Sequence, residues 1–233
     1  MKFPTRFILQ GKRPPMKQFT TASVNRLTKQ LSLIISLGLM GVLIMSTPAF
    51  AHHPLGGRLP ANVFEGFFSG VAHPVIGFDH LAFVIAAGLV GVLSKRGIVI
   101  PITFVAASLG GTGLHLLLMD LPAPELVISA SVLVFGILLA FGQSFNLLLV
   151  VVLGIIAGIF HGYAYGEAVV GAEMTPLFSY LVGFTSIQLV ISLSAWKLGN
   201  VWLKNNAIQG LLHLRFIGFT ICGLGAAFLS GIA

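Results

Sequence analysis

Charged side chains are scarce in this 233-residue chain, at 8% of the residues, with 13 Lys+Arg and 6 Asp+Glu. Soluble domains carry about 25% charged residues, so this chain lacks the polar side chains to cover such a domain. Intrinsic disorder is excluded because it requires low hydrophobicity, and hydrophobic residues reach 56% here. A single cysteine, Cys222, excludes an intramolecular disulfide. The class that remains is the integral membrane protein.

The formal net charge of +7 does not indicate a nucleic-acid partner, because it is concentrated at the start of the chain. Seven of the 13 cations precede residue 30, and an apolar stretch over 31–45 and the sequence Ala49-Phe50-Ala51 follow. This order is typical of a secretory signal peptide. We therefore predict a cleaved signal peptide over residues 1–51 and a membrane domain over 52–233. The alternative is that the apolar stretch is an uncleaved first span.

Apolar segments in residues 52–233 recur at lengths that suit a transmembrane helix. The alternating pattern of a β-barrel is absent from them, so helices are required. We predict an all-α integral membrane protein with six transmembrane helices in a compact bundle. Glycines four residues apart, such as Gly154 and Gly158, would permit tight helix packing or a homo-oligomer contact. The predicted spans are about 74–93, 98–119, 126–142, 147–161, 176–196 and 210–232.

The loop charges predict the orientation, because cytoplasmic loops are enriched in Lys and Arg. If the mature N-terminus lies outside, the loops after the first, third and fifth spans are cytoplasmic. Those loops carry the cations Lys95, Arg96, Lys197 and Lys204, whereas the outer loops carry the acids Asp120, Glu125, Glu167 and Glu173. The predicted location is therefore the inner (plasma) membrane, with several spans and the mature N-terminus outside.

The first group of candidate site residues is His73, Asp79 and His80, since ionisable side chains in a span are costly. Pro74 suits the first turn of a helix, which places His73 at the helix cap. His80 would follow nearly two turns later on the same face. Two imidazoles and a carboxylate match the ligands of Ni²⁺, Co²⁺ or Zn²⁺. The alternative is that Asp79 caps a local break at Gly77 while the histidines bond backbone carbonyls.

A second group, His161 and Glu167, lies in a glycine-rich stretch at the expected outer end of the fourth span. Glycines there could let the backbone open while both side chains turn inward. Alternatively, the stretch is an aromatic-rich interfacial loop, since Tyr is common at that depth. Glu173 could replace Glu167 as the loop ligand. The weaker metal-ligand candidates are His52, His53, His115 and Glu173.

These motifs give the chain a family resemblance. The pattern His73-x5-Asp79-His80, followed by Phe160-His161-Gly162 and a downstream Glu, resembles the HupE/UreJ family. That family comprises small bacterial membrane proteins associated with hydrogenase and urease gene clusters and regarded as nickel, sometimes cobalt, permeases. The resemblance implies Ni²⁺ or Co²⁺ as a transported substrate, with no permanently bound cofactor. In one departure, Tyr163 or Tyr165 stands where the second motif tends to have a His.

We therefore predict a permease and not an enzyme, with a divalent metal ion and the lipid bilayer as its partners. The sequence contains no nucleotide-binding motif. The membrane potential could drive uptake, because moving a +2 ion inward is worth about 4.6 kcal/mol per 100 mV. One alternative is an intramembrane metal-dependent hydrolase that uses the same His/Asp cluster. Another is a metal-binding assembly partner for a second membrane complex.

Overall fold

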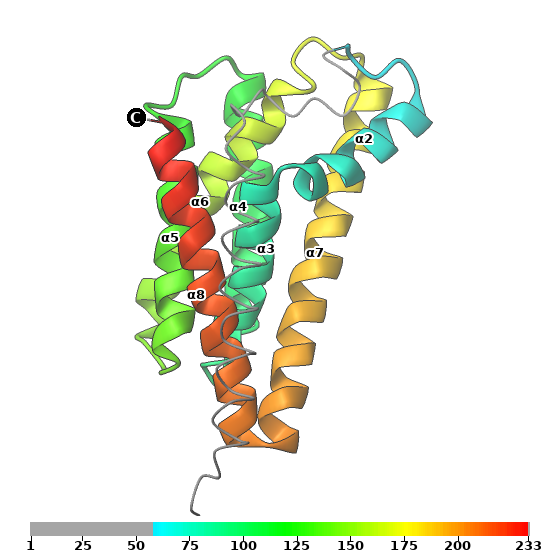
Figure 1. The fold of residues 1–233 in the computed structure, drawn as a ribbon. Coiled ribbons are helices and arrows are strands. Elements are labelled where there is room, and N and C mark those ends of the chain that lie inside the picture. The colour runs from blue at the N-terminus through cyan, green and yellow to red at the C-terminus, as the bar shows by residue number, and fades with distance from the viewer. Residues whose placement is uncertain (1–57, 233) are drawn as a thin grey trace, which may run out of the picture. The chain divides into compact units, whose positions relative to one another are not determined.

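The computed structural model describes residues 58–232, which all lie within one of the two units of the chain, residues 42–233. The predicted signal peptide, His52 and His53 lie outside the described residues. Residues 58–232 form α-helices and no strand (Figure 1). The helices are α2 (Val63–Ile76), α3 (Phe78–Gly91), α4 (Val99–Leu116), α5 (Pro124–Phe141), α6 (Leu147–Glu167), α7 (Met174–Asn205) and α8 (Ala207–Ile232).

Five of these helices, α4 to α8, are each long and apolar enough to cross a membrane. The short helices α2 and α3 pass that test only as a pair, and the pair is bent by 80°. The described residues therefore contain five candidate spans, or six if the bent pair counts as one. The prediction of an all-α membrane protein is confirmed at this level.

The predicted continuous first span, with His73 at its cap, is wrong. His73 and Pro74 lie inside α2, with His73 in its last turn, and α3 begins one residue after Gly77. The N–H of Gly77 still bonds the His73 carbonyl, at 3.1 Å, and extended backbone at Gly77 then ends α2. The break at Gly77, one part of the alternative, is confirmed, but Nδ1 of His73 and Nδ1 of His80 bond the side chains of Tyr180 and His161. At the start of α3, Asp79 Oδ1 accepts the His80 N–H at 2.8 Å, which satisfies one of the unpaired amides of the first turn.

Two predicted loops are wrong because the helices continue through them. Helix α6 extends past His161 to Glu167, and only residues 168–173 separate it from α7. The glycines of α6 serve helix contact instead of opening the backbone: a Cβ at Gly162 would collide with the Ser108 carbonyl oxygen. Helix α7 likewise continues to Asn205, so the predicted loop between the fifth and sixth spans shrinks to Asn206.

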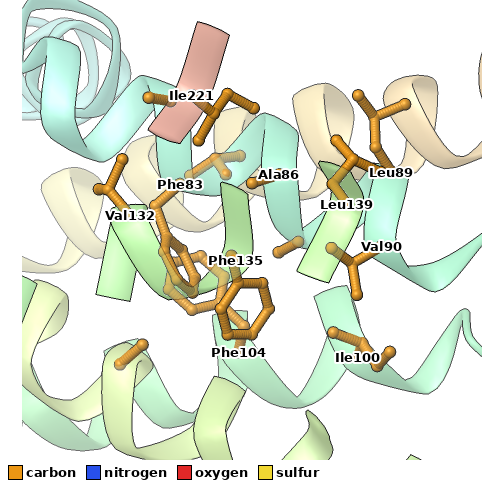
Figure 2. Packing of buried hydrophobic residues seen from close by; sticks show 14 of the residues in the cluster. Phe83, Ala86, Leu89, Val90, Ile100, Phe104, Val132, Phe135, Leu139 and Ile221 are labelled. Carbon is orange, nitrogen blue, oxygen red and sulfur yellow. The ribbon is translucent and has the colours of Figure 1, made fainter. Parts of the chain in front are cut away.

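Helix α3 is central to the packing, since it contacts α2, α4, α5, α7 and α8 (Figure 1). More extensive contacts join α4 to α6, α5 to α8 and α2 to α7. Phe83 of α3 is fully buried, and its ring centroid lies 4.8 Å from that of Phe104 and 4.6 Å from that of Phe135. Figure 2 shows these three rings side by side in the core. Aromatic packing thus fixes α3 against α4 and α5.

The charges separate between the two ends of the helices. The turns after α3 and α5 and at Asn206 lie at one end, and the turns after α4 and α6 lie at the other (Figure 1). Arg215 of α8 donates from Nε to the Ala140 carbonyl at 3.0 Å, near the C-terminus of α5. The first end carries Lys95, Arg96 and Lys204, and the second carries Asp120, Glu125, Glu167 and Glu173.

Candidate metal-binding site

His73 is 6% exposed at the end of α2 and contacts α7. Its Nδ1 lies 2.7 Å from the hydroxyl oxygen of Tyr180, which also donates to the Tyr165 carbonyl at 2.9 Å. A carbonyl oxygen can only accept, and the hydroxyl has one proton, so Tyr180 accepts the Nδ1–H of His73. With a neutral imidazole, the lone pair that could bind a metal is then on Nε2 of His73.

His80 is held by a chain of hydrogen bonds that crosses three helices. Its Nδ1 lies 2.8 Å from Nδ1 of His161, and Nε2 of His161 lies 3.0 Å from Ser131 Oγ. Ser131 in turn donates to the Ile128 carbonyl at 2.6 Å. Ser131 therefore accepts from His161 Nε2–H, and His161 Nδ1 accepts from His80 Nδ1–H. With neutral rings, the lone pair of His80 is also on Nε2.

The bend at Gly77 brings the first two histidines together although they lie on different helices. The ring centroids of His73 and His80 are 5.9 Å apart. Tyr165 of α6 packs against both rings, at 5.1 Å from His73 and 4.6 Å from His80. Tyr165 is fully buried, and its hydroxyl has no hydrogen-bond partner within residues 58–232. An unpaired buried hydroxyl costs on the order of 1–3 kcal/mol, so its position beside two imidazoles requires a reason.

The structure brings His73, His80 and His161 into one buried cluster, with the half-buried Asp79 next to His80. It does not assemble all of the predicted ligands. In the described part of the chain, no group of three or more His, Cys, Asp or Glu side chains could hold a metal ion. Glu167 and Glu173 are exposed at the end of α6 and just before α7. Any metal bound by the imidazoles would therefore need further ligands, such as water.

The remaining described candidate, His115 of α4, packs against Tyr163 with ring centroids 4.2 Å apart. It is partly exposed, and its Nδ1 has no hydrogen-bond partner among residues 58–232. Sequence reasoning missed Ser131 and Tyr180 altogether. Both are single polar residues in apolar helices, and no motif in the sequence distinguishes them from serines and tyrosines that only pack.

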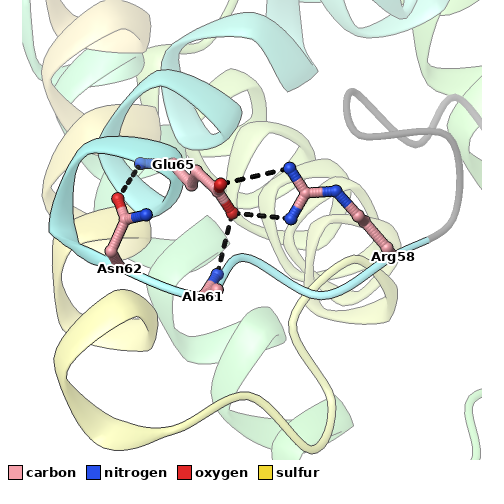
Figure 3. Close-up of polar contacts among 4 residues, drawn as sticks. All are labelled: Arg58, Ala61, Asn62 and Glu65. Atoms are coloured by element: carbon pink, nitrogen blue, oxygen red, sulfur yellow. Dashed lines mark hydrogen bonds and ion pairs between the residues drawn. The ribbon is translucent and has the colours of Figure 1, made fainter.

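An exposed ion pair fixes the start of α2, at the same end of the molecule as the acidic turns. Figure 3 shows Arg58 making two contacts with Glu65, at 2.8 and 3.1 Å, while Ala61 N–H donates to the same carboxylate at 2.9 Å. Asn62 accepts the Glu65 N–H at 2.9 Å and so caps the helix. The hydrogen bond to the Glu65 carboxylate, together with its charge, raises the pKa of Arg58. The positive charge of Arg58 is thereby offset by a neighbouring carboxylate.

Apolar helices of spanning length around a buried imidazole cluster define a multi-pass membrane protein. The HupE / UreJ protein family matches residues 40–228, so the chain belongs to the HupE/UreJ family. Protein HupE of Rhizobium leguminosarum bv. viciae is 26% identical over 189 residues, which cover 80% of this chain and 94% of that relative. No solved structure matches the chain. Metal transport across a membrane is the general activity that family membership supports.

Proposed function

We propose that the protein takes up a divalent transition metal, Ni²⁺ or else Co²⁺, across the bacterial inner membrane for metalloenzyme maturation. The observation that carries the proposal is the pair of buried imidazoles at the bend between α2 and α3. Each uses its Nδ1 in a hydrogen bond, to Tyr180 for His73 and to His161 for His80. Metal-ligating histidines show this arrangement, in which the second nitrogen fixes the ring and its tautomer.

In this proposal the metal binds Nε2 of His73 and Nε2 of His80, and Asp79 offsets part of its charge. Imidazole nitrogen is a ligand that suits Ni²⁺ and Co²⁺. Water completes the coordination, and the unpaired Tyr165 hydroxyl hydrogen-bonds to one of those waters. His161 is a positioning residue: it accepts the hydrogen bond from His80 Nδ1 and does not bind the metal itself. A site with few protein ligands can release its cargo, as a permease requires.

The distribution of charge supports inward transport. With the acidic end outside, Glu167 and Glu173 would attract cations toward the entrance, and the cations Lys95 and Arg96 would face the cytoplasm. The mature N-terminus would then be outside, as expected after removal of a signal peptide. The membrane potential supplies about 4.6 kcal/mol per 100 mV for a +2 ion. Uptake would need no resident cofactor and no ATP.

Uptake of ⁶³Ni²⁺ and ⁵⁷Co²⁺ by cells that lack their own importers tests the proposal. Relative to wild type, His73→Ala and His80→Ala should lower the initial rate by about tenfold or more, since each removes a first ligand. His213→Ala is the matched control, because His213 is exposed on α8 against Trp202 and should transport normally. Wild-type uptake at the empty-vector level, with the protein correctly inserted, would exclude the permease. Metal-dependent hydrolysis by that inserted protein would then favour the hydrolase.

A further inference from the structure

A second group of buried oxygens lies on α7, away from the imidazoles. Gln188 is completely buried, and its Nε2 donates to the Phe184 carbonyl at 3.2 Å and to Ser108 Oγ at 3.4 Å. The Phe184 carbonyl can only accept, which fixes the amide orientation and assigns Oε1 to the other side. Ser108 donates to the Val105 carbonyl at 2.8 Å and is thus free to accept from Gln188. Across residues 58–232, Gln188 Oε1 has no hydrogen-bond partner.

A neighbouring hydroxyl oxygen is likewise buried without a hydrogen-bond partner in the described residues. Thr185 Oγ1 is also buried and makes no hydrogen bond with any group between residues 58 and 232. Thr185 and Gln188 are three positions apart on α7, a separation at which side chains on a helix are neighbours. One turn further on, Ser192 donates to the Gln188 carbonyl at 2.6 Å. Buried polar oxygens without a hydrogen-bond partner are uncommon in folded proteins, so two of them on neighbouring positions need an explanation.

Gln188 lies on the same helix as Tyr180, which bonds the imidazole of His73. Tyr180, Phe184, Gln188 and Ser192 recur every four residues along α7, and Tyr180 is the residue that bonds His73. Gln188 is eight residues beyond Tyr180, about 12 Å further along the helix toward the basic end.

A route along α3 from the cluster toward the basic end passes aromatic rings. His161 packs on Phe83, with ring centroids 4.6 Å apart, and on Phe104, at 5.8 Å. These rings belong to the aromatic core and are fully buried (Figure 2). A cation that leaves the imidazoles would meet a hydrocarbon surface there, whereas α7 presents oxygen atoms.

We propose that Gln188 Oε1 and Thr185 Oγ1 form a second binding station for the divalent metal, between the imidazoles and the basic end. The inference rests on the proposed transport function and adds a step to it. Neutral amide and hydroxyl oxygens replace waters around the ion but bind it more weakly than imidazole. Weak binding suits this position, because an ion in transit must leave each station as well as enter it.

The test uses the full-length protein in lipid vesicles, with ⁶³Ni²⁺ as the probe and two measurements. Gln188→Leu keeps the side-chain size and removes the amide. It should lower the initial uptake rate by about tenfold or more, while the equilibrium affinity for Ni²⁺ at the imidazoles stays within about twofold of wild type. Gln143→Leu is the control, since Gln143 is exposed in the turn between α5 and α6 and should behave as wild type. Wild-type uptake by Gln188→Leu would overturn the inference.

A second variant covers the case in which Gln188→Leu does not insert. Gln188→Glu has the same length and adds a negative charge, so it should retain one more Ni²⁺ per chain and slow release. Unchanged stoichiometry and uptake in Gln188→Glu would overturn the second station. If wild type itself neither binds nor transports Ni²⁺, the proposed function fails and the station fails with it. If wild type transports Ni²⁺ and Gln188→Leu matches it, only the station fails.

Discussion

The Nδ1 atoms of His80 on α3 and His161 on α6 lie 2.8 Å apart, and the two rings are buried together. One of these nitrogens must donate and the other must accept. Ser131 decides which, because it can only accept from His161 once it donates to the Ile128 carbonyl. A serine on α5 therefore sets the tautomer of an imidazole on α3.

The first prediction follows from that chain of hydrogen bonds. Ser131→Ala removes the acceptor of His161 Nε2–H, so the tautomers of His161 and His80 will mix. Loss of such an outer partner typically lowers metal affinity by about 10–100-fold. Equilibrium Ni²⁺ binding should show this decrease, and ¹⁵N shifts of the histidine rings should show mixed tautomers. Ser129→Ala, at a buried serine two residues earlier, is the control. Equal effects of both changes would contradict the positioning role.

The second prediction concerns the bend. A Cβ at Gly77 would lie 2.6 Å from Cδ2 of His80 and 3.2 Å from Oδ1 of Asp79. The His80 ring cannot move away freely, because it packs against His161 and Tyr165. Gly77→Ala should thus displace His80 and weaken Ni²⁺ binding by about tenfold or more, by analogy with the loss of a positioning partner.

The control for Gly77→Ala is Gly110→Ala on α4, where no atom lies within 4 Å of the added Cβ. Alanine is favoured over glycine inside a helix by about 1 kcal/mol, so Gly110→Ala should bind Ni²⁺ normally and unfold no earlier than wild type. Normal Ni²⁺ binding by Gly77→Ala would show that the ring has room to adjust.

The third prediction is a pH dependence. A protonated imidazole has no lone pair for a metal. Ni²⁺ binding should therefore weaken as the pH is lowered far enough to protonate the buried imidazoles, and it should recover when the pH is raised. His213→Ala should keep the same profile, since the proposal gives it no ligand role. Binding that stays constant at every acid pH at which the protein remains folded would contradict imidazole ligation.

The fourth prediction tests the contact between α4 and α6. A Cβ at Gly162 would collide with the Ser108 carbonyl, and one at Gly111 would collide with the Ile159 carbonyl. Gly162→Val should force these helices apart and destabilise the protein by about 1–3 kcal/mol or more. Thermal unfolding in detergent should show a lower midpoint. Gly113→Val, where nothing lies within 4 Å, should change the midpoint much less.

The spans could be predicted because apolar segments of spanning length are a property of the sequence itself. The bend at Gly77 is different, since apolar residues flank it on both sides and a helical pattern continues through it. The reason for a glycine at the break is visible only in the structure, because a side chain at position 77 would meet the His80 ring. The continuation of α6 was missed for a similar reason. A glycine such as Gly162 suggests a helix end in the sequence, whereas in the structure it lets α6 pack closely against Ser108 of α4.

The site could be predicted only in part. His73, Asp79 and His80 are close in sequence, and their chemistry alone makes them candidates. Tyr180 of α7 bonds His73, and Ser131 of α5 bonds His161, which in turn bonds His80. A hydrogen bond between distant helices leaves no local pattern in the sequence. For the same reason the sequence could not show that Glu167 would end exposed, away from the histidines.

The break at Gly77 also places two helix ends next to the imidazoles. The last carbonyls of α2 carry about half a negative charge, and the first amides of α3 carry about half a positive one. Asp79 lies in the first turn of α3 and accepts one of those amides, so its carboxylate compensates the positive end. His73 lies at the negative end of α2. A neutral His73 imidazole carries no positive charge that would offset the partial negative charge of the α2 carbonyls. The backbone itself therefore gives the bend an electric field that favours a cation.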